Sequence, residues 1–380
     1  MKWEKVKLGN VTDSCLGKML DQNKNKGDYQ PYLANVNVRW GEFDLEDLPL
    51  MKFEESEQER YELKYGDLVI CEGGEPGRCA IWKEQIPNMK IQKALHRVRV
   101  HDCLDYRYLF YWFLLAGKTG ELDQYFTGAT IKHMPGQKLK EVVIDKPPLE
   151  IQHRIADILS AYDDLIENNQ KQIKLLEEAA QRLYKEWFVD LNFPGHENTK
   201  IVDGVPEGWI KEEIGKIIKK VHRTKQIVAS EYKDEGSIPI VDQSRAFVAG
   251  YTNDLEARVD FGIPIIVFGD HTRIVKLIQF PFAKGADGTQ LIISGCLEMP
   301  QRLLYCSIMN VDLSNYHYAR HFKYLKEEKI MIPTVKVANE FENNVTGIFS
   351  KIQNCRDEII RCQKTRDLLL PKLMSGEVEV

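Results

Sequence analysis

The sequence predicts an α+β protein built from two mixed α/β domains, each followed by a long helix. Two apolar stripes with helical spacing, and a faint repeat of the segments before them, support this class. A length of 380 residues suits two or three domains. We expect a first domain over residues 1–146, a central helix over 147–194, a second domain over 195–335 and a C-terminal helix over 336–380.

The central helix is predicted by apolar side chains that recur every three or four residues after Pro147 and Pro148. The two prolines end the preceding segment and open the helix. Two polar positions, Asn169 and Gln172, interrupt the stripe; they either fix the register as a buried Asn does in coiled coils, or mark a frayed or solvent-facing stretch. The expected packing residues are Ile151, Ile155, Ile158, Leu165, Asn169, Leu176 and Leu183.

A second stripe with the same spacing begins at Phe341 and is interrupted at Arg366. A long helix with one apolar stripe needs a partner to cover it, so we expect the two helices to pack together. The expected packing residues of the C-terminal helix are Phe341, Val345, Ile348, Ile352, Ile359 and Leu373.

The segments before the two helices also repeat. A repeat this long with only two copies indicates a duplication and not a solenoid. The matching pairs are Trp3 with Trp209, Leu8-Gly9 with Ile214-Gly215, Pro31 with Pro239, and Leu139-Lys140-Glu141 with Leu325-Lys326-Glu327.

The first domain is expected to contain short strands bounded by turn residues, and a buried helix over 106–116 whose aromatic side chains form core. Net charge is −5, which argues against a polyanion partner. The acidic excess, however, is confined to 42–62, whereas 78–100 is rich in Arg and Lys and follows the flexible Gly73-Gly74. These cations indicate ligand contact or a solvated strand face. The expected strands are 31–38, 67–71, 80–82, 96–100 and 142–144.

In the second domain a buried strand over 265–268 runs into Gly269-Asp270-His271-Thr272-Arg273. Asp270 and His271 suggest a catalytic or metal site, but adjacent residues of a strand point to opposite faces and no further ligand lies at metal-binding spacing. Side chains of this kind on a loop are equally what reading base edges requires. No phosphate-binding glycine loop is present.

Composition places the chain in the cytoplasm. No apolar run reaches the ~18 residues of a membrane span, so we expect no membrane partner. Eight cysteines lie without metal-ligand spacing and are expected to be reduced thiols.

Four segments together carry a resemblance to a known family. They are Gly128-Ala129-Thr130-Ile131-Lys132-His133, the stretch from Pro147 to Ile155, Leu183 to Asp190 (LYKEWFVD) and Leu368 to Gly376 (LLLPKLMSG). Over essentially its whole length the chain resembles the specificity subunits of type I restriction-modification systems. The segments 269–273 and 285–288 are similar to one subclass of that family's target recognition domains.

The resemblance implies two target recognition domains held apart by an antiparallel coiled coil of two conserved helices, in pseudo-two-fold symmetry. Each domain would read one half of a gapped site on double-stranded DNA, and the helices would act as a spacer and dock two methyltransferase subunits. Those subunits would bring S-adenosylmethionine and methylate adenine; restriction and translocase subunits would add ATP- and Mg-dependent steps. This chain would be non-catalytic, without a cofactor or metal. The alternative is a DNA-binding or coiled-coil scaffold protein outside a restriction system.

Within this resemblance, the expected DNA contacts are polar and cationic side chains of the loops, with two glycines. In the first domain they are Asn37, Arg39, Gly73, Gly74, Arg78, Lys93, Thr130, Lys132 and His133. In the second domain they are Gln243, Arg245, Asp270, His271, Thr272, Arg273, Lys284 and Asp287. The near-neutral charge of the domains suggests that partner subunits share the phosphate contacts.

Overall fold

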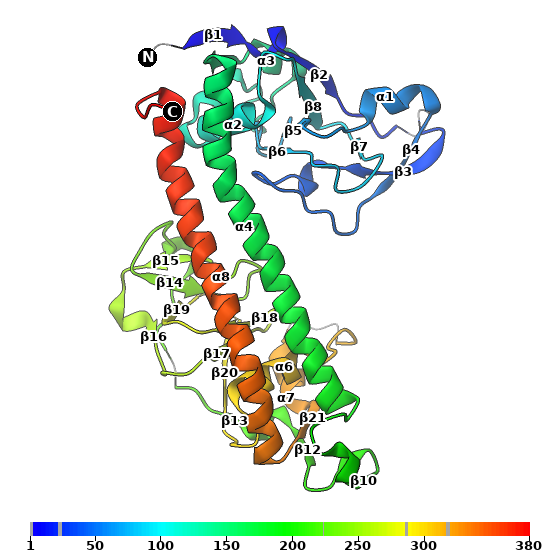
Figure 1. Cartoon of the computed structure of the whole chain (residues 1–380), viewed down its shortest axis with the longest axis vertical. Coiled ribbons are helices and arrows are strands. Elements are labelled where there is room, and N and C mark those ends of the chain that lie inside the picture. The colour runs from blue at the N-terminus through cyan, green and yellow to red at the C-terminus, as the bar shows by residue number, and fades with distance from the viewer. Residues whose placement is uncertain (1–2, 22–24, 223, 286–287, 317–319) are drawn as a thin grey trace. The chain divides into compact units, whose positions relative to one another are not determined.

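The computed structural model describes residues 3–21, 25–222, 224–285, 288–316 and 320–380, which form two compact units (Figure 1). We call Met1–Glu167 with Ile359–Val380 the first unit, and Asn168–Glu358 the second unit. The division falls inside both long helices, α4 (Leu149–Tyr184) and α8 (Val335–Ser375). Each unit therefore contains a globular part and a section of each helix. No helix in the described ranges is long and apolar enough to cross a membrane.

The globular part of the first unit contains a four-stranded sheet of order β2-β8-β5-β6 and a three-stranded sheet of order β4-β3-β7. Strands β3 and β7 are parallel, and β1 pairs separately with β9. Helix α2 confirms the predicted buried helix, because Tyr108 and Phe113 are fully buried. The bounds are β1 (Glu4–Lys7), β2 (Thr12–Leu16), β3 (Asp28–Leu33), β4 (Leu50–Phe53), α1 (Gln58–Tyr61), β5 (Leu68–Cys71), β6 (Cys79–Ile81), β7 (Lys90–Ile91), β8 (Leu95–Val100), α2 (Tyr106–Thr119), α3 (Gly136–Glu141) and β9 (Val143–Lys146).

One predicted strand of the first unit is wrong in its second half. The strand expected over 31–38 ends early, and Asn35–Asn37 form a 3-10 turn. Asn37 closes this turn: its Oδ1 accepts from the Ala34 backbone N–H at 2.9 Å, and its Nδ2 donates to the Asp44 carbonyl at 3.0 Å. Side-chain hydrogen bonds to the local backbone compete with strand pairing, which explains the difference.

The second unit repeats the same topology. Its sheets have the orders β13-β20-β17-β18 and β15-β14-β19-β16, β14 and β19 are parallel, and β12 pairs separately with β21. The predicted duplication is thus confirmed strand by strand. The bounds are β10 (Ile201–Val202), β11 (Val205–Pro206), β12 (Ile210–Glu213), α5 (Ile214–Ile217), β13 (Ile218–Lys219), β14 (Ile238–Val241), β15 (Gly250–Thr252), β16 (Arg258–Val259), β17 (Ile265–Gly269), β18 (Val275–Ile278), β19 (Phe282–Lys284), β20 (Thr289–Ser294), α6 (Gln301–Met309), α7 (His321–Glu327) and β21 (Lys329–Ile332).

The duplication extends to single contacts. A Cβ atom at Gly9 would lie 2.9 Å from the Lys140 Cβ, and one at Gly215 would lie 3.0 Å from the Lys326 Cβ. In each unit a glycine therefore lets a short connection pack against the third-from-last element, α3 or α7.

Helices α4 and α8 run antiparallel within the second unit. Phe341 packs against Tyr184 and Phe188 near one end, with ring centroids 6.3 and 5.1 Å apart, whereas Cys355 Sγ lies 4.0 Å from Gln172 Oε1 farther along. As α8 advances, its partner residues on α4 therefore recede. In the first unit the pairing continues through an ion pair between Arg366 and Asp163, so the charged interruption of the second stripe has a partner.

The apolar stripe of α8 is buried as predicted. Phe341, Val345, Ile352 and Leu373 are at most 2% exposed, and Ile348 and Ile359 are half-buried.

The predicted stripe of α4 needs a correction at two positions. Ile158 and Leu165 are 37% and 44% exposed, and the buried residues lie one position later, at Leu159 and Ile166. The buried face also uses the polar or small residues Gln152, Ala156, Asn169 and Ala180, which a search for large apolar residues overlooks. Asn169 is buried as the register hypothesis requires; Ile155 is buried, and Ile151, Leu176 and Leu183 are half-buried.

Candidate nucleic-acid interface

The candidate site of the first unit lies where β5 ends. The backbone of Gly73 forms a β-bridge with His133, and the Asn35 amide donates to the Gly73 carbonyl at 3.0 Å. A Cβ at Gly73 would lie 2.8 Å from His133 Nδ1, and one at Gly74 would lie 2.5 Å from Asn35 Nδ2. Both positions therefore require glycine, because segments of the chain itself approach the backbone closely.

A tight loop carries the next predicted contacts. Thr127 and His133 exchange two backbone hydrogen bonds of 2.7 and 2.8 Å, which close the loop and leave Thr130 and Lys132 exposed at its tip. Lys132 is held loosely by Asp123, at 3.3 Å between exposed side chains. Arg39 and Lys93 are also exposed. The structure thus gathers most of the predicted residues of the first unit at one end of its sheet.

Two predicted contacts of the first unit serve the fold. Asn37 is 6% exposed, and both ends of its amide are bonded within the loop. Arg78 donates to Glu75 Oε2 at 2.9 Å and to the Asn35 carbonyl at 3.1 Å, so its guanidinium braces the glycine loop. Base contact by either side chain stays a prediction.

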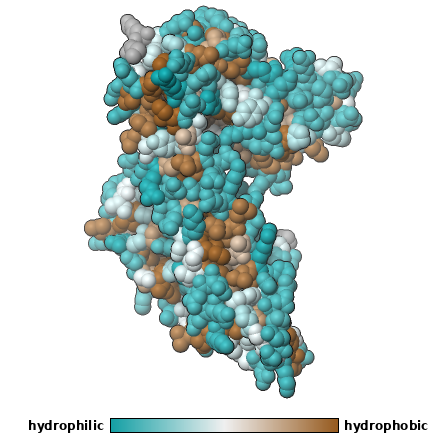
Figure 2. Space-filling view, viewed as in Figure 1, coloured by the Kyte–Doolittle hydropathy of each residue, from teal (hydrophilic) through white to brown (hydrophobic). Residues whose placement is uncertain are grey.

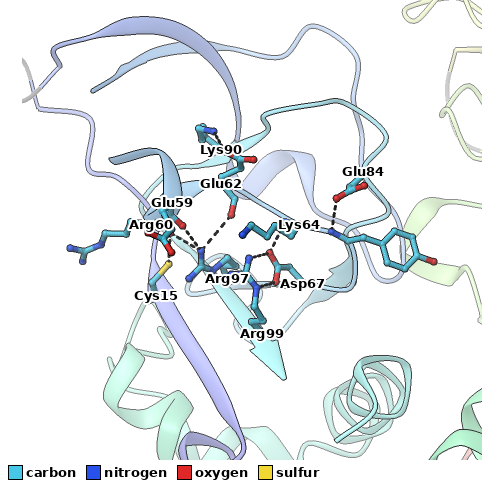
Figure 3. Close-up of polar contacts among 11 residues, drawn as sticks. Cys15, Glu59, Arg60, Glu62, Lys64, Asp67, Glu84, Lys90, Arg97 and Arg99 are labelled. Carbon is cyan, nitrogen blue, oxygen red and sulfur yellow. Dashed lines mark hydrogen bonds and ion pairs between the residues drawn. The ribbon is translucent and has the colours of Figure 1, made fainter. Parts of the chain in front are cut away.

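The cationic stretch 78–100 is largely neutralised inside the first unit (Figure 3). Arg99 makes a two-pronged contact with the buried Asp67, at 2.8 and 2.7 Å, and this hydrogen bonding raises the pKa of the Arg99 guanidinium. Arg97 donates to the Glu59 and Arg60 carbonyls at 3.1 and 2.9 Å. Lys90 pairs with Glu62 at 3.0 Å. The expectation that this stretch faces a ligand is therefore wrong for Lys90, Arg97 and Arg99. Around α1, β3 and β4, the surface in Figure 2 is mostly hydrophilic.

The candidate site of the second unit lies at the corresponding place, after β17. The Gln243 side-chain oxygen accepts from the His271 backbone N–H at 3.1 Å, and Thr272 Oγ1 donates to the Gln243 carbonyl at 2.7 Å. Arg273, with a positive φ of 63°, donates to the Leu313 carbonyl at 3.1 Å. These contacts fix the loop and leave His271 and the neighbouring Arg245 exposed.

The buried Lys276 holds the second wall of this site. Its ammonium donates to the Asp242 carbonyl at 2.8 Å and also to the Ala246 carbonyl. Burial lowers the pKa of Lys276 to about 8. The lysine therefore braces the segment that carries Gln243 and Arg245 and does not itself face a ligand.

The same clasp holds the loop in both units. In the first, the Met134 backbone N–H donates to the Glu72 carbonyl at 2.7 Å; in the second, the His321 N–H donates to the Asp270 carbonyl at 2.9 Å. Two loops of different sequence are thus presented at equivalent ends of equivalent sheets. Lys284 ends β19 beside the second loop and is half-buried, and Asp287 lies outside the described residues.

The geometry does not join Asp270 and His271 into a catalytic pair. Asp270 Oδ1 accepts from the Phe322 backbone N–H at 2.8 Å, so the carboxylate anchors the start of α7. Among the described residues no three His, Cys, Asp or Glu side chains converge as a metal site. Sequence reasoning missed Asn35 and Phe322, whose roles depend on contacts between distant segments and leave no local signal.

Comparison with known proteins gives a consistent result. A family model for the type I restriction modification DNA specificity domain matches residues 1–178. Over 343 residues the chain is 31% identical to the specificity subunit of the type I restriction enzyme MjaIX of Methanocaldococcus jannaschii, covering 83% of this chain and 78% of that one. It is 28% identical over 240 residues to the MjaVIII specificity subunit of the same organism, covering 62% and 53% of the two chains. The crystal structure of the type I restriction-modification S subunit from M. genitalium has a similar fold, with a TM-score of 0.56 and 17% identity over 98% of this chain and 96% of that one.

Proposed function

Because the chain belongs to the family of type I restriction-modification specificity subunits, we propose that each of its globular parts reads one half of a gapped, two-part site on double-stranded DNA. The observation that carries the proposal is the pair of equivalent loops, each fixed by hydrogen bonds to its own backbone and each presenting exposed polar side chains. Hydrogen-bonding groups on a rigid loop can discriminate base edges in the major groove.

The two half-sites differ in sequence under this proposal. Thr130, Lys132 and His133 occupy the loop region of the first unit, whereas Arg245 and His271 occupy that of the second. Arg pairs with the two acceptors of guanine, and Thr and Lys present different donor patterns. Duplicated frameworks with unlike loops therefore read unlike bases.

We propose that α4 and α8 act as the spacer and dock two methyltransferase subunits. Large apolar residues left exposed on the helices support a protein partner: Ile158, Leu165 and Leu175 on α4, at 37%, 44% and 64%, and Leu368 on α8, at 70%. Partner subunits would bring S-adenosylmethionine for adenine methylation, and restriction subunits would bring ATP and Mg for translocation and cleavage. The chain itself would do no chemistry, and its work on DNA would take place in the cytoplasm.

The loop of the second unit gives a direct test. In a His271→Ala and Arg245→Ala double variant, we expect discrimination at the bases read by the second domain to fall roughly 5- to 150-fold, because one well-placed contact is worth about 1–3 kcal/mol. Adenine methylation mapping in cells checks this, and the other half of the motif should keep its sequence.

The matched control is Lys211→Ala, which removes one exposed cation from β12, outside both four-stranded sheets. Its methylation motif should equal that of the wild type. If the double variant kept full discrimination at both halves, the loop would not be the reader. A variant that bound the site normally but lost turnover would favour an enzyme that uses Asp270 and His271.

A further inference from the structure

A groove in the second unit, which the sequence did not single out, lies beside the candidate loop. It has a volume of about 730 Å³ and is lined by the segment after β13, by β20 and by α7. Its cationic lining includes Lys219, Lys220, Lys284 and Lys326, together with His222. None of its described lining residues is acidic. A concave surface of this charge attracts a polyanion.

The lysines of this groove are available to a ligand. Lys219, Lys220 and Lys326 are exposed, and the described part of the chain places no carboxylate in an ion pair with them. Their neighbours differ: Lys216 pairs with Glu212 at 2.9 Å and Lys225 pairs with Asp254 at 2.7 Å. The basic stretch therefore contains both neutralised and free cations.

The groove adjoins the loop that we propose reads bases. Phe322 lines the groove, and its backbone N–H donates to the Asp270 carboxylate at 2.8 Å. The Lys326 ammonium lies over the Phe322 ring, 5.2 Å from its centroid. Cations thus flank the loop, as phosphates flank the base edges in a DNA groove.

The first unit lacks such a surface at the equivalent place. Strand pairing of Thr12 with Val100, and of Ile218 with Ser294, sets the two frameworks in register. By that register the next residue, Lys219 in the second unit, is Asp13 in the first. Asp13 is 78% exposed in its side chain and carries the opposite charge. Lys220 likewise corresponds to the uncharged Ser14.

From this asymmetry we infer that the second domain supplies the main phosphate-backbone contacts of the complex, through Lys219, Lys220 and Lys326, and that the first domain contributes much less to electrostatic affinity. The inference rests on the proposed DNA-reading function and adds an unequal division of labour to it. The cations of the first unit are spent on its own acidic stretch, through Lys90, Arg97 and Arg99.

Salt dependence of binding measures this contribution. The probe is a 30-base-pair duplex of random sequence, titrated with the full chain assembled with methyltransferase subunits at a series of KCl concentrations. Replacing Lys219, Lys220 and Lys326 with Gln should make the slope of log affinity against log salt shallower by about 0.9 per lost contact, and lower the affinity at 100 mM KCl by about tenfold.

Two matched variants sharpen the test. Lys216→Gln with Lys225→Gln removes the ion-paired cations of the same stretch and should leave the slope unchanged. Asp13→Lys with Ser14→Lys should steepen the slope by about 0.9 per new contact. Thermal unfolding checks that every variant folds.

An unchanged slope in the triple variant would overturn the inference, as would an equal change in the Lys216 and Lys225 control, which would indicate a general charge effect. Either result would leave the proposed function intact if methylation mapping still showed a two-part motif. Loss of that motif in the wild-type comparison would instead contradict the proposed function itself.

Discussion

Replacing Phe341 with alanine is expected to lower the free energy of unfolding of the second unit by about 3–5 kcal/mol. The ring is fully buried and packs against Tyr184, Trp187 and Phe188, with centroids 6.3, 5.7 and 5.1 Å away. Truncation removes the contacts between α8 and α4 and leaves a cavity among three large rings that cannot easily close. Urea unfolding followed by tryptophan fluorescence suits the measurement, because Trp187 borders the site.

The same substitution at Phe261 provides the control. Phe261 also belongs to the second unit but is 42% exposed, so Phe261→Ala should cost about 1 kcal/mol. Similar losses for the two variants would mean that the helix pair does not depend on the Phe341 cluster.

Lengthening both helices together is expected to lengthen the spacer of the recognised DNA site. We would insert three heptads into α4 after Glu167 and three into α8 after Glu358, where the two units divide. Whole heptads preserve the apolar stripe. At ~1.5 Å per residue they add about 31 Å, close to one turn of DNA at ~34 Å, so both readers keep the same face of the duplex.

Methylation mapping would then show the same two half-sites separated by roughly nine or ten additional base pairs. An insertion of equal length made of Gly and Ser is the control, because a flexible linker fixes no distance and should give no single spacer. If the heptad variant still methylated the original spacing, the helices would not set the distance between half-sites.

The helices show what periodicity can and cannot predict. The stripe of α8 was predicted correctly because its buried positions carry large apolar residues such as Val345 and Ile352. The stripe of α4 was displaced at two positions, because burial there also falls on Gln152, Ala156 and Ala180. Their small or polar side chains are covered by neighbours, and only the packed structure shows that.

The candidate site was predictable in its location but less so in its chemistry. Strands that end in glycine and polar residues located both loops, since such residues mark turns. The charge of 78–100 was misjudged, because the pairing of Arg99 with Asp67 depends on which strands become neighbours. Lys219 and Lys220 were visible as a basic pair, but their freedom from partners appears only once their neighbours Lys216 and Lys225 are seen to be paired.

The central claim is that this chain chooses the DNA site that a partner methylates. Single-molecule sequencing of adenine methylation tests it most directly, in cells that carry this chain with its methyltransferase partner and in cells from which this chain is deleted. The account predicts a gapped, two-part motif that is methylated in the first and absent in the second. Unchanged methylation after the deletion, with assembly of the complex demonstrated in the undeleted cells, would contradict it and favour a scaffold role.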